Sequence, residues 1–321
     1  MTRLKRSATP ALSDDRSLRL RAAWLYHAQG LTQNEVAEKL GLGRSTVIRL
    51  LDEAKERGEV KVWIEEGEAG LMELAARLEQ AFGLDEAIVV PSSTTVEATA
   101  RSVGLALGKF LSEVIVGGMT IGVGWGRTLT SSLASFHPPR HENIRIMSLV
   151  GGAIETEQSN PVEFSWRLAS VLGAECFLFP APVIVDSAET KRRLIELSGL
   201  DRLFKLAASL DLAVLGVGDI GHASSSVASR MVSKPELKEL MALGAVGDVM
   251  CNFLDAEGQA VPHAVNGRIM SIDLATIRKA GHIVLAGGGA ERARAIAAAI
   301  KATRCNTLVT DEAAARQLVG S

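Results

Sequence analysis

The sequence predicts two parts of different fold class, a small helical domain followed by a larger α/β domain built around a parallel sheet. Amphipathic helical segments fill the chain up to Gly58, whereas near-continuous apolar runs alternate with helical segments from about residue 84 to the end of the 321-residue chain. Such runs, rich in valine, isoleucine and leucine, are typical of strands covered by helices on both faces. We expect domains at 1–66 and 84–321, joined by a linker helix at 67–83.

Composition and charge narrow the class of protein. Hydrophobic residues make up 47% of the chain and charged residues 22%, as in a soluble globular protein. The net charge of −2 gives no global attraction to nucleic acid, but 11 lysines and arginines stand against 7 acidic residues up to Gly58. A polyanionic partner would therefore meet the N-terminal part of the chain.

The location and the redox state follow from what the sequence lacks. No early apolar run resembles a signal peptide and no run is long enough to span a bilayer, so we expect a cytoplasmic protein without a membrane partner. The three cysteines, Cys176, Cys251 and Cys305, are widely spaced in apolar surroundings. This pattern predicts buried free thiols rather than a disulfide or a metal site.

The N-terminal part is predicted to hold three helices. Thr32 and Glu35 have the spacing of a capping box at the start of the second helix, and glycines end the first and the third. Beyond them, alternating apolar and charged residues predict a short strand, and the stretch "GEAG" predicts a hinge. In chain order the predicted segments are a disordered tail at 1–15, helices at 18–30, 32–40 and 44–58, a strand at 59–66, the hinge at 67–70 and a helix at 71–82.

The segment from Gln33 to Leu51 has the layout of a helix-turn-helix. Two helices that cross closely need a small residue at the crossing, a positive φ at the turn and apolar residues facing the core. Seven positions fit these needs at the required spacing: Val36, Ala37, Leu40, Gly41, Leu42, Val47 and Leu50. An ordinary helical pair is the alternative, and the outward-facing residues argue against it.

These outward-facing residues have the chemistry of DNA contacts. We expect Arg44 and Thr46 to contact base edges, and Ser45 and Arg49 to position the phosphate backbone. Operator DNA is therefore an expected partner. The candidate DNA-binding residues are Thr32, Gln33, Arg44, Ser45, Thr46 and Arg49.

Seven apolar runs predict the strands of the larger domain. In parallel sheets ligands bind at the carboxyl ends of the strands, and four of these ends carry the glycine-rich stretches "GVGWG", "LVGG", "GVGD" and "LAGGG". Four such exits indicate one shared crevice. The runs are "EAIVVP", "MTIGVGW", "IRIMSLVGG", "AECFLFPAPVIV", "LDLAVLGVG", "HIVLAGGG" and "NTLVTD".

The stretch "GVGWGRT" is expected to form one wall of this crevice. Gly124 and Gly126 precede a helix start, where bare backbone N–H groups attract an anion, and Arg127 and Thr128 add side-chain donors. The stretch matches neither the dinucleotide fingerprint nor a Walker motif. A tight turn followed by a surface arginine is the alternative.

The stretch "LAGGGAERARAI" repeats this arrangement and is expected to form a second wall. Gly288 lies in its glycine run, and Arg292 follows close enough to face a ligand held there; a solvated basic helix face is the alternative. Asp248 has the chemistry to accept hydrogen bonds from sugar hydroxyls, whereas Asp255 in "DAEG" is expected to be a turn residue. Asn160, on a long loop, is a further polar candidate.

No constellation of residues supports catalysis. The sequence contains no nucleophile elbow, no histidine or cysteine spacing that suits a metal, and no supportable pairing of a cysteine with a histidine. We therefore predict no catalytic residue, no metal and no cofactor. The competing function is an isomerase or deaminase acting on a sugar phosphate, with Asp248 as its base.

Taken together, these features resemble the SorC family of bacterial sugar-binding transcriptional regulators over nearly the whole chain. The resemblance implies a helix-turn-helix joined to a Rossmann-like effector domain related in fold to ribose-5-phosphate isomerase and glucosamine-6-phosphate deaminase. It also implies a homo-oligomer, usually a tetramer, whose DNA affinity changes with a sugar, polyol or sugar phosphate. The matching pieces include "GLTQNEVAEKLGLGRSTVIRLLDEAKERGEVKVWI", "IGVGWGRTL", "LVGG", "FPAPVIVDSAETKRRLI", "LDLAVLGVGDI", "LGAVGDVMCNFLDAEG" and "AGGGAERARAIAAAI".

The resemblance also implies which residues line the pocket, and one of them departs from the family. The family commonly has a lysine after the "AGG" loop, where this chain has Arg292. The positive charge is kept, but arginine reaches further and bonds in a planar fork, which leaves the ligand and its phosphorylation open. The other implied pocket positions are Arg127, Thr128, Gly151, Gly152, Asn160 and Asp248.

The expected function is a DNA-binding transcriptional regulator of a carbohydrate or polyol catabolic operon. Effector and operator would favour different arrangements of the assembled subunits, so that binding one changes the affinity for the other. Besides the enzyme, a second alternative is a regulator that responds to no small molecule and uses its large domain only for assembly.

Overall fold

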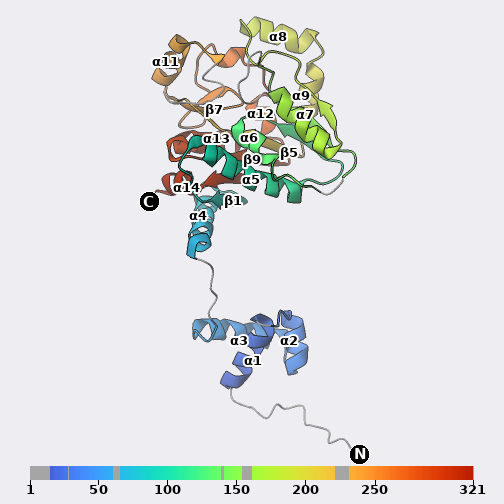
Figure 1. Cartoon of the computed structure of the whole chain (residues 1–321), viewed down its shortest axis with the longest axis vertical. Helices are drawn as coiled ribbons and strands as arrows, with labels where there is room; N and C mark the ends of the chain where they lie inside the picture. The colour runs from blue at the N-terminus through green and yellow to red at the C-terminus, as the bar shows by residue number, and fades with distance from the viewer. Residues whose placement is uncertain are drawn as a thin grey trace, which may run out of the picture. The chain divides into compact units, whose positions relative to one another are not determined.

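The computed structural model describes residues 15–27, 29–60, 66–138, 141–153, 161–220 and 231–320. The chain divides into two compact units, Met1–Glu66 and Gly67–Ser321, and Figure 1 shows the fold of each. Some predicted features fall outside the described residues. These are the tail at 1–14, the central part of the strand predicted at 59–66, and Asn160.

The smaller unit contains the three predicted helices, α1 (Asp15–His27), α2 (Gln33–Leu40) and α3 (Arg44–Glu56). The apolar positions of the predicted helix-turn-helix face its core: Val47 and Leu50 are fully buried, and Leu42 is half-buried against them. Gly41 ends α2 in the left-handed region, with φ of 68°, as the turn requires.

The larger unit is built on a parallel sheet of seven strands, and each strand lies within one of the seven apolar runs. Along the sheet their order is β1-β10-β9-β5-β2-β3-β4, and all neighbouring pairs are parallel. The predicted fold class is therefore confirmed. The strands are β1 (Glu86–Val90), β2 (Thr120–Val123), β3 (Arg145–Ser148), β4 (Glu175–Phe177), β5 (Leu212–Gly216), β9 (His282–Ala286) and β10 (Thr307–Asp311).

The strand order reverses between β2 and β5. From β2 the chain moves outward through β3 and β4, then returns to β5 on the other side of β2 and continues outward through β9 and β10. In open α/β sheets such a switch point leaves a crevice at the carboxyl ends of the two strands, because the connections leave in opposite directions. The topology therefore places a candidate site at the ends of β2 and β5.

Helices cover both faces of the sheet, as predicted. Alternate residues of β5 point to opposite faces, so that Val214 packs in one apolar cluster and Leu215 in the other. The first cluster contains residues of α5 (Val96–Val114), α6 (Arg127–Ser132) and α7 (Pro161–Leu172). The second contains residues of α4 (Glu66–Phe82), α9 (Asp201–Ala207), α12 (Leu274–Ile277), α13 (Ala293–Thr303) and α14 (Glu312–Val319).

A second, antiparallel sheet of three strands follows the order β6-β7-β8. Its apolar side packs with Trp125, which comes directly after β2, in a third cluster. The second sheet therefore lies next to the switch point. The remaining elements are β6 (Gly218–Asp219), β7 (Ala245–Val249), β8 (Asn252–Asp255), α8 (Ala188–Leu197), α11 (Lys234–Ala242), η1 (Asn266–Arg268) and η2 (Ala290–Arg292).

One local prediction is wrong. The hinge predicted at 67–70 belongs to α4, which begins at Glu66 rather than near residue 71. Two glycines weaken a helix by about 1 kcal/mol each, but the apolar face of α4, with Leu74 and Leu78 buried in the core, stabilises the whole helix.

Other local predictions hold. Asp255 ends β8 and stabilises the turn that follows, because its Oδ1 accepts hydrogen bonds from the backbone N–H groups of Glu257 and Gln259, each at 2.9 Å. The three cysteines are free thiols, with Cys176 only half-buried, and burial raises the pKa of the Cys305 thiol to about 12. Among the described helices, none is both long and apolar enough to cross a membrane.

Candidate functional site

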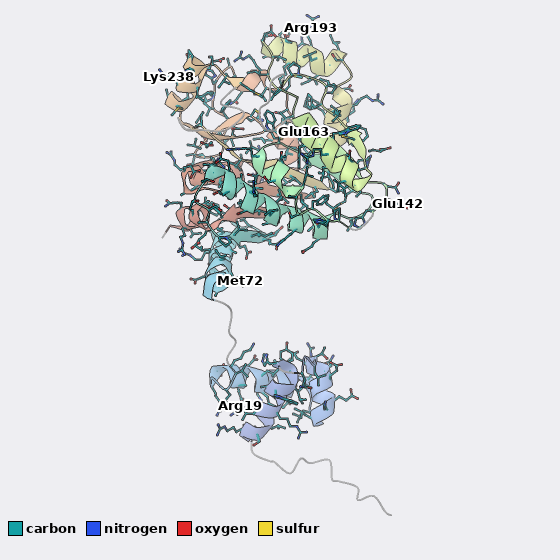
Figure 2. The ribbon with its side chains drawn as sticks, viewed as in Figure 1. Arg19, Met72, Glu142, Glu163, Arg193 and Lys238 are labelled. Atoms are coloured by element: carbon teal, nitrogen blue, oxygen red, sulfur yellow. The ribbon has the colours of Figure 1, made fainter. Side chains whose placement is uncertain are left out.

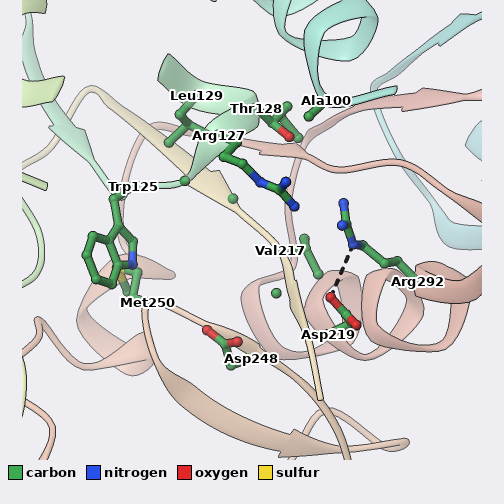
Figure 3. Close-up of a pocket in the computed structure, with 14 residues that line it drawn as sticks. Ala100, Trp125, Arg127, Thr128, Leu129, Val217, Asp219, Asp248, Met250 and Arg292 are labelled. Atoms are coloured by element: carbon green, nitrogen blue, oxygen red, sulfur yellow. Dashed lines mark hydrogen bonds and ion pairs between the residues drawn. The ribbon is translucent and has the colours of Figure 1, made fainter. Parts of the chain in front are cut away.

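A pocket lies at the switch point of the sheet, where β2, β5 and β9 end (Figure 3). Five of the predicted effector-binding residues line it: Gly126, Arg127, Thr128, Asp248 and Arg292. The other lining residues are Ala100, Trp125, Leu129, Gly216, Val217, Gly218, Asp219, Met250 and Ala286.

The first wall of the pocket is the turn between β2 and α6. Gly126 has φ of 128°, a conformation that side chains rarely adopt, and it begins α6. Thr128 is buried, whereas Arg127 keeps a fifth of its side chain exposed, with its Nη1 3.0 Å from Oε1 of Glu97. An ion pair with such an exposed partner contributes little free energy.

The second wall carries Arg292, which is buried although it is charged. Its Nε donates to Oδ1 of Asp219 at 3.3 Å, and its Nη1 donates to the carbonyl oxygen of Gly288 at 3.2 Å. In Figure 3 the guanidinium groups of Arg127 and Arg292 extend toward one another from opposite walls. The two guanidinium groups therefore lie near one another across the pocket.

Two carboxylates also line the pocket. Asp248 on β7 is buried and its Oδ2 accepts from the backbone N–H of Cys251 at 3.0 Å. Gly218 pairs with Asp248 across β6 and β7, which brings the neighbouring Asp219 to the same region. Figure 3 shows both carboxylates below the two guanidinium groups.

The hairpin that follows Asp248 is conformationally unusual. Met250, which lines the pocket, and Cys251 have φ of 50° and 65°, values that hairpin turns normally give to asparagine or glycine. The Asp248 carboxylate stabilises this turn through the Cys251 N–H. Burial and the charge of Asp248 together raise the pKa of the Cys251 thiol well above its usual value, so this cysteine is a neutral thiol rather than a nucleophile.

Four predicted glycines do not line this pocket. Gly124 donates its N–H to the Val214 carbonyl at 2.9 Å, within the sheet. A Cβ on Gly151 would lie 2.5 Å from the carbonyl oxygen of Ala181, and a Cβ on Gly288 would lie 2.9 Å from Asp311 Oδ1. Neighbouring backbone explains Gly151, and neighbouring side chains explain Gly288. The fourth, Gly152, donates to Ala181 at 2.8 Å.

Sequence reasoning missed Asp219 as the partner of Arg292. The signal was present in "GVGD", whose glycines were noted as a strand exit while the aspartate that follows them was not. Asp219 matters because folding brings it to Arg292, a residue 73 positions further along the chain. Trp125 and Met250 carry no polar signal that a search for anion-binding residues would detect.

The lining suits a polyhydroxylated ligand. Carboxylates accept hydrogen bonds from hydroxyl groups, guanidinium groups donate to hydroxyl or anionic oxygens, and the buried Thr128 adds a hydroxyl. Within the described part of the chain, no group of three or more histidine, cysteine, aspartate or glutamate residues could hold a metal ion.

The helix-turn-helix presents a separate polar surface. The predicted capping box is present, because the Thr32 N–H donates to Oε2 of Glu35 at 2.8 Å and the Glu35 N–H donates to Thr32 Oγ1 at 3.4 Å. Arg44 Nη2 donates to Oε1 of Gln33 at 3.3 Å, which ties the starts of α2 and α3 together. Arg44 and Ser45 are exposed and Thr46 is half-buried.

A hollow on this unit runs from the end of α1 to the start of α3. It brings Thr32, Gln33 and Arg44 to one concave surface, together with Tyr26, His27, Gly30, Leu31 and Asn34. The candidate DNA-binding residues at the start of α2 therefore lie beside the first residue of α3. Arg49 lies further along α3, where it pairs with Glu53.

A helix-turn-helix together with a pocket-bearing α/β unit defines the class of ligand-responsive DNA-binding regulators. Residues 68–320 match the family model described as "Putative sugar-binding domain", and residues 13–71 match a homeodomain-like domain. The chain belongs to the SorC family of sugar-binding transcriptional regulators.

Similar proteins cover almost the whole chain. The erythritol catabolism regulatory protein EryD of Brucella abortus is 32% identical over 310 residues, 95% of this chain and 97% of that protein. The deoxyribonucleoside regulator of Bacillus subtilis is 28% identical over 316 residues, 95% and 98% of the two chains. The crystal structure of the full-length sorbitol operon regulator SorC from Klebsiella pneumoniae matches with a TM-score of 0.72 and 26% identity, and it covers 96% of this chain and 100% of that one.

Proposed function

We propose that this chain regulates transcription of a carbohydrate or polyol catabolic operon, and that a sugar, polyol or sugar phosphate in the switch-point pocket changes its affinity for operator DNA. The observation that carries the proposal is the pocket lining, which brings two arginines, Arg127 and Arg292, together with two carboxylates, Asp219 and Asp248. The names of the relatives, which refer to erythritol, deoxyribonucleosides and sorbitol, support the ligand class.

We infer separate roles for the two ends of the ligand. Its hydroxyl groups donate to the carboxylates of Asp219 and Asp248, and an oxygen-rich or phosphorylated end accepts from Arg127, Arg292 and Thr128. A phosphate would gain most from the two guanidinium groups, since charge-assisted hydrogen bonds are the stronger ones. Asn160, Gly124, Gly151, Gly152 and Gly288 remain candidates for shaping the same region.

On the DNA side, the proposal assigns base edges to Arg44 and Thr46 and phosphates to Ser45 and Arg49, with Thr32 and Gln33 beside them. The regulator acts as a cytoplasmic homo-oligomer, with a tetramer as the expected form. Effector and operator stabilise different arrangements of the subunits, so that each changes the affinity for the other by the same factor.

A ligand panel tests this function. Thermal unfolding of the full chain is measured with sugars, polyols and their phosphates, because a specific ligand raises the midpoint by mass action. The ligand with the largest shift is then added to the chain bound to a duplex selected from a random-sequence pool. We expect a change in DNA affinity of about fivefold or more, the range of typical allosteric coupling. A panel in which no compound changes DNA affinity would contradict the proposal.

The enzyme alternative, with Asp248 as base, is tested on the same protein. The Asp248 carboxylate accepts a hydrogen bond from the Cys251 N–H and stabilises the hairpin. This structural role favours ligand binding by Asp248 over proton transfer. We expect no turnover when the full chain is incubated with aldose phosphates and amino-sugar phosphates. Measurable isomerisation or deamination that Asp248→Asn abolishes would favour the enzyme.

A further inference from the structure

A chain of ion pairs crosses the smaller unit from its interior to α3. It starts at Arg19 on α1 (Figure 2), which is only 2% exposed. The Nε and Nη2 atoms of Arg19 donate to the two carboxylate oxygens of Glu59, at 2.6 and 2.7 Å. This two-bond geometry fixes the guanidinium in one place.

Glu53 on α3 lies between this fixed arginine and the surface. Its Oε2 lies 3.7 Å from Nη1 of Arg19, and its Oε1 accepts from Nη1 of Arg49 at 2.5 Å. The Glu53 side chain is 23% exposed, whereas that of Arg49 is 58% exposed. The buried Arg19 therefore restrains the Glu53 side chain, and Glu53 in turn restrains Arg49 at the surface.

This arrangement differs from an ordinary surface pair. An exposed ion pair four residues apart on a helix loses much of its Coulomb energy to the entropy of ordering two long side chains. Here Glu53 is already ordered by the charge of Arg19, so only Arg49 has to be ordered. A DNA phosphate that binds Arg49 must therefore compete with a carboxylate that is already in position.

We propose that Glu53 is a specificity-determining residue for DNA binding, because it restrains Arg49 and lowers the affinity of the protein for DNA of unrelated sequence. The inference rests on the proposed function, in which Arg49 contacts the phosphate backbone. Non-specific binding depends on phosphate contacts alone. Restraining Arg49 therefore weakens non-specific binding more than it weakens binding to the operator. On the operator, base contacts align α3 so that a phosphate replaces Glu53 at Arg49.

Glu53→Gln tests this inference, since it removes the negative charge and keeps the size of the side chain. Fluorescence anisotropy with a short duplex of unrelated sequence is expected to show an affinity about two- to fivefold higher, the range of such ion pairs. The slope of log affinity against log salt steepens by about one unit, because one more cation neutralises a phosphate. The ratio of affinities for a pool-selected duplex and the unrelated duplex falls.

Glu56→Gln is the matched control. Glu56 is exposed on the same helix, and no ion pair within the described structure joins it to Arg49. The control removes an equal charge, so we expect a change in affinity below about twofold. In an Arg49→Ala background, Glu53→Gln is expected to have no further effect, because it acts through Arg49.

Several outcomes separate this inference from the proposed function. Equal effects of Glu53→Gln and Glu56→Gln, or an effect of Glu53→Gln that persists without Arg49, would overturn the inference alone. An unchanged affinity and salt slope in Arg49→Ala would contradict the proposed contact of Arg49 with DNA, and with it the inference. Thermal unfolding of each variant shows whether the fold is retained, and the comparison within the Arg49→Ala background corrects for any loss of stability.

Discussion

Each unit of the molecule buries one arginine next to a carboxylate, and the two sites differ in geometry. Arg19, in the smaller unit, forms two hydrogen bonds of 2.6 and 2.7 Å with Glu59. Arg292, in the larger unit, meets Asp219 through Nε at 3.3 Å and the Gly288 carbonyl at 3.2 Å. Arg292 lines a pocket, where it extends toward a second arginine, Arg127.

The difference indicates what each buried charge does. The Glu59 carboxylate forms two parallel hydrogen bonds with the Arg19 guanidinium. This pair fixes the loop after α3 to α1 and stabilises the fold. Asp219 meets Arg292 through a longer hydrogen bond of 3.3 Å, and Arg292 lines the pocket. We therefore expect Arg19, which forms two hydrogen bonds with Glu59, to matter for stability, and Arg292, which lines the pocket, to matter for binding.

The largest effect is expected from breaking the pair in the smaller unit. Arg19→Met removes the charge while filling a similar volume, and it leaves Glu59 without its main partner. Amide hydrogen exchange in α1 and α3 should become faster by about tenfold or more, because this unit opens more often. Arg21→Met, on the exposed face of α1, is the control and should leave exchange unchanged. Equal effects of the two variants would refute the structural role of Arg19.

The next effect concerns the pocket. Arg292→Ala should weaken binding of the ligand chosen from the panel by about thirtyfold or more, or about 2 kcal/mol, because it leaves Asp219 and the ligand without a buried donor. Arg127→Ala should weaken it less, since the Arg127 side chain is 21% exposed and its partner Glu97 is 70% exposed. Isothermal titration calorimetry measures both.

Arg294→Ala is the control for the pocket variants, since Arg294 is exposed on α13, two residues after Arg292. Arg292→Lys keeps the charge but loses the planar fork, so an intermediate affinity is expected. If Arg127→Ala proved more damaging than Arg292→Ala, the assignment of the buried arginine to binding would be wrong.

The smallest effect is a change with pH. The hydrogen bonds from Arg19 hold the pKa of the Glu59 carboxyl below its usual value of 4.5. A lowered pKa in the folded state means that the pair stabilises the fold above pH 4.5 and that this stabilisation is lost as the pH falls through the lower, folded value. The protection of the α1 amides, taken as the ratio of the intrinsic to the observed exchange rate, should therefore fall more steeply below pH 4.5 in the unmodified chain than in Glu59→Gln. Parallel profiles would contradict this linkage.

The sequence was sufficient for those features that depend on local patterns. The apolar runs predict all seven parallel strands, because strands buried on both faces have no polar positions to obscure them. The spacing around Gly41 predicts the helix-turn-helix for the same kind of reason, since each required residue type is visible on its own. The sequence could place Arg127, Thr128, Asp248 and Arg292 near one pocket, because polar residues at strand ends are conspicuous, and their binding of an effector stays a prediction.

Features that depend on contacts between distant segments could not be predicted. Arg19 and Glu59 are 40 residues apart, and Asp219 and Arg292 are 73 apart, so nothing local marks them as pairs. The glycines Gly151 and Gly288 were expected at the pocket, but the structure explains them by the close approach of other segments. The "GEAG" hinge was wrong because packing elsewhere on α4 outweighs two glycines.

The strand order also has a consequence for how the protein is made. The switch-point pocket needs β2, β5 and the loop with Arg292, so it can form only after the chain has been synthesised beyond Arg292. The helix-turn-helix is complete by Val60, and N-terminal domains generally fold first as the chain emerges from the ribosome. A nascent chain, or one truncated before Arg292, would therefore hold a folded helix-turn-helix without a formed switch-point pocket.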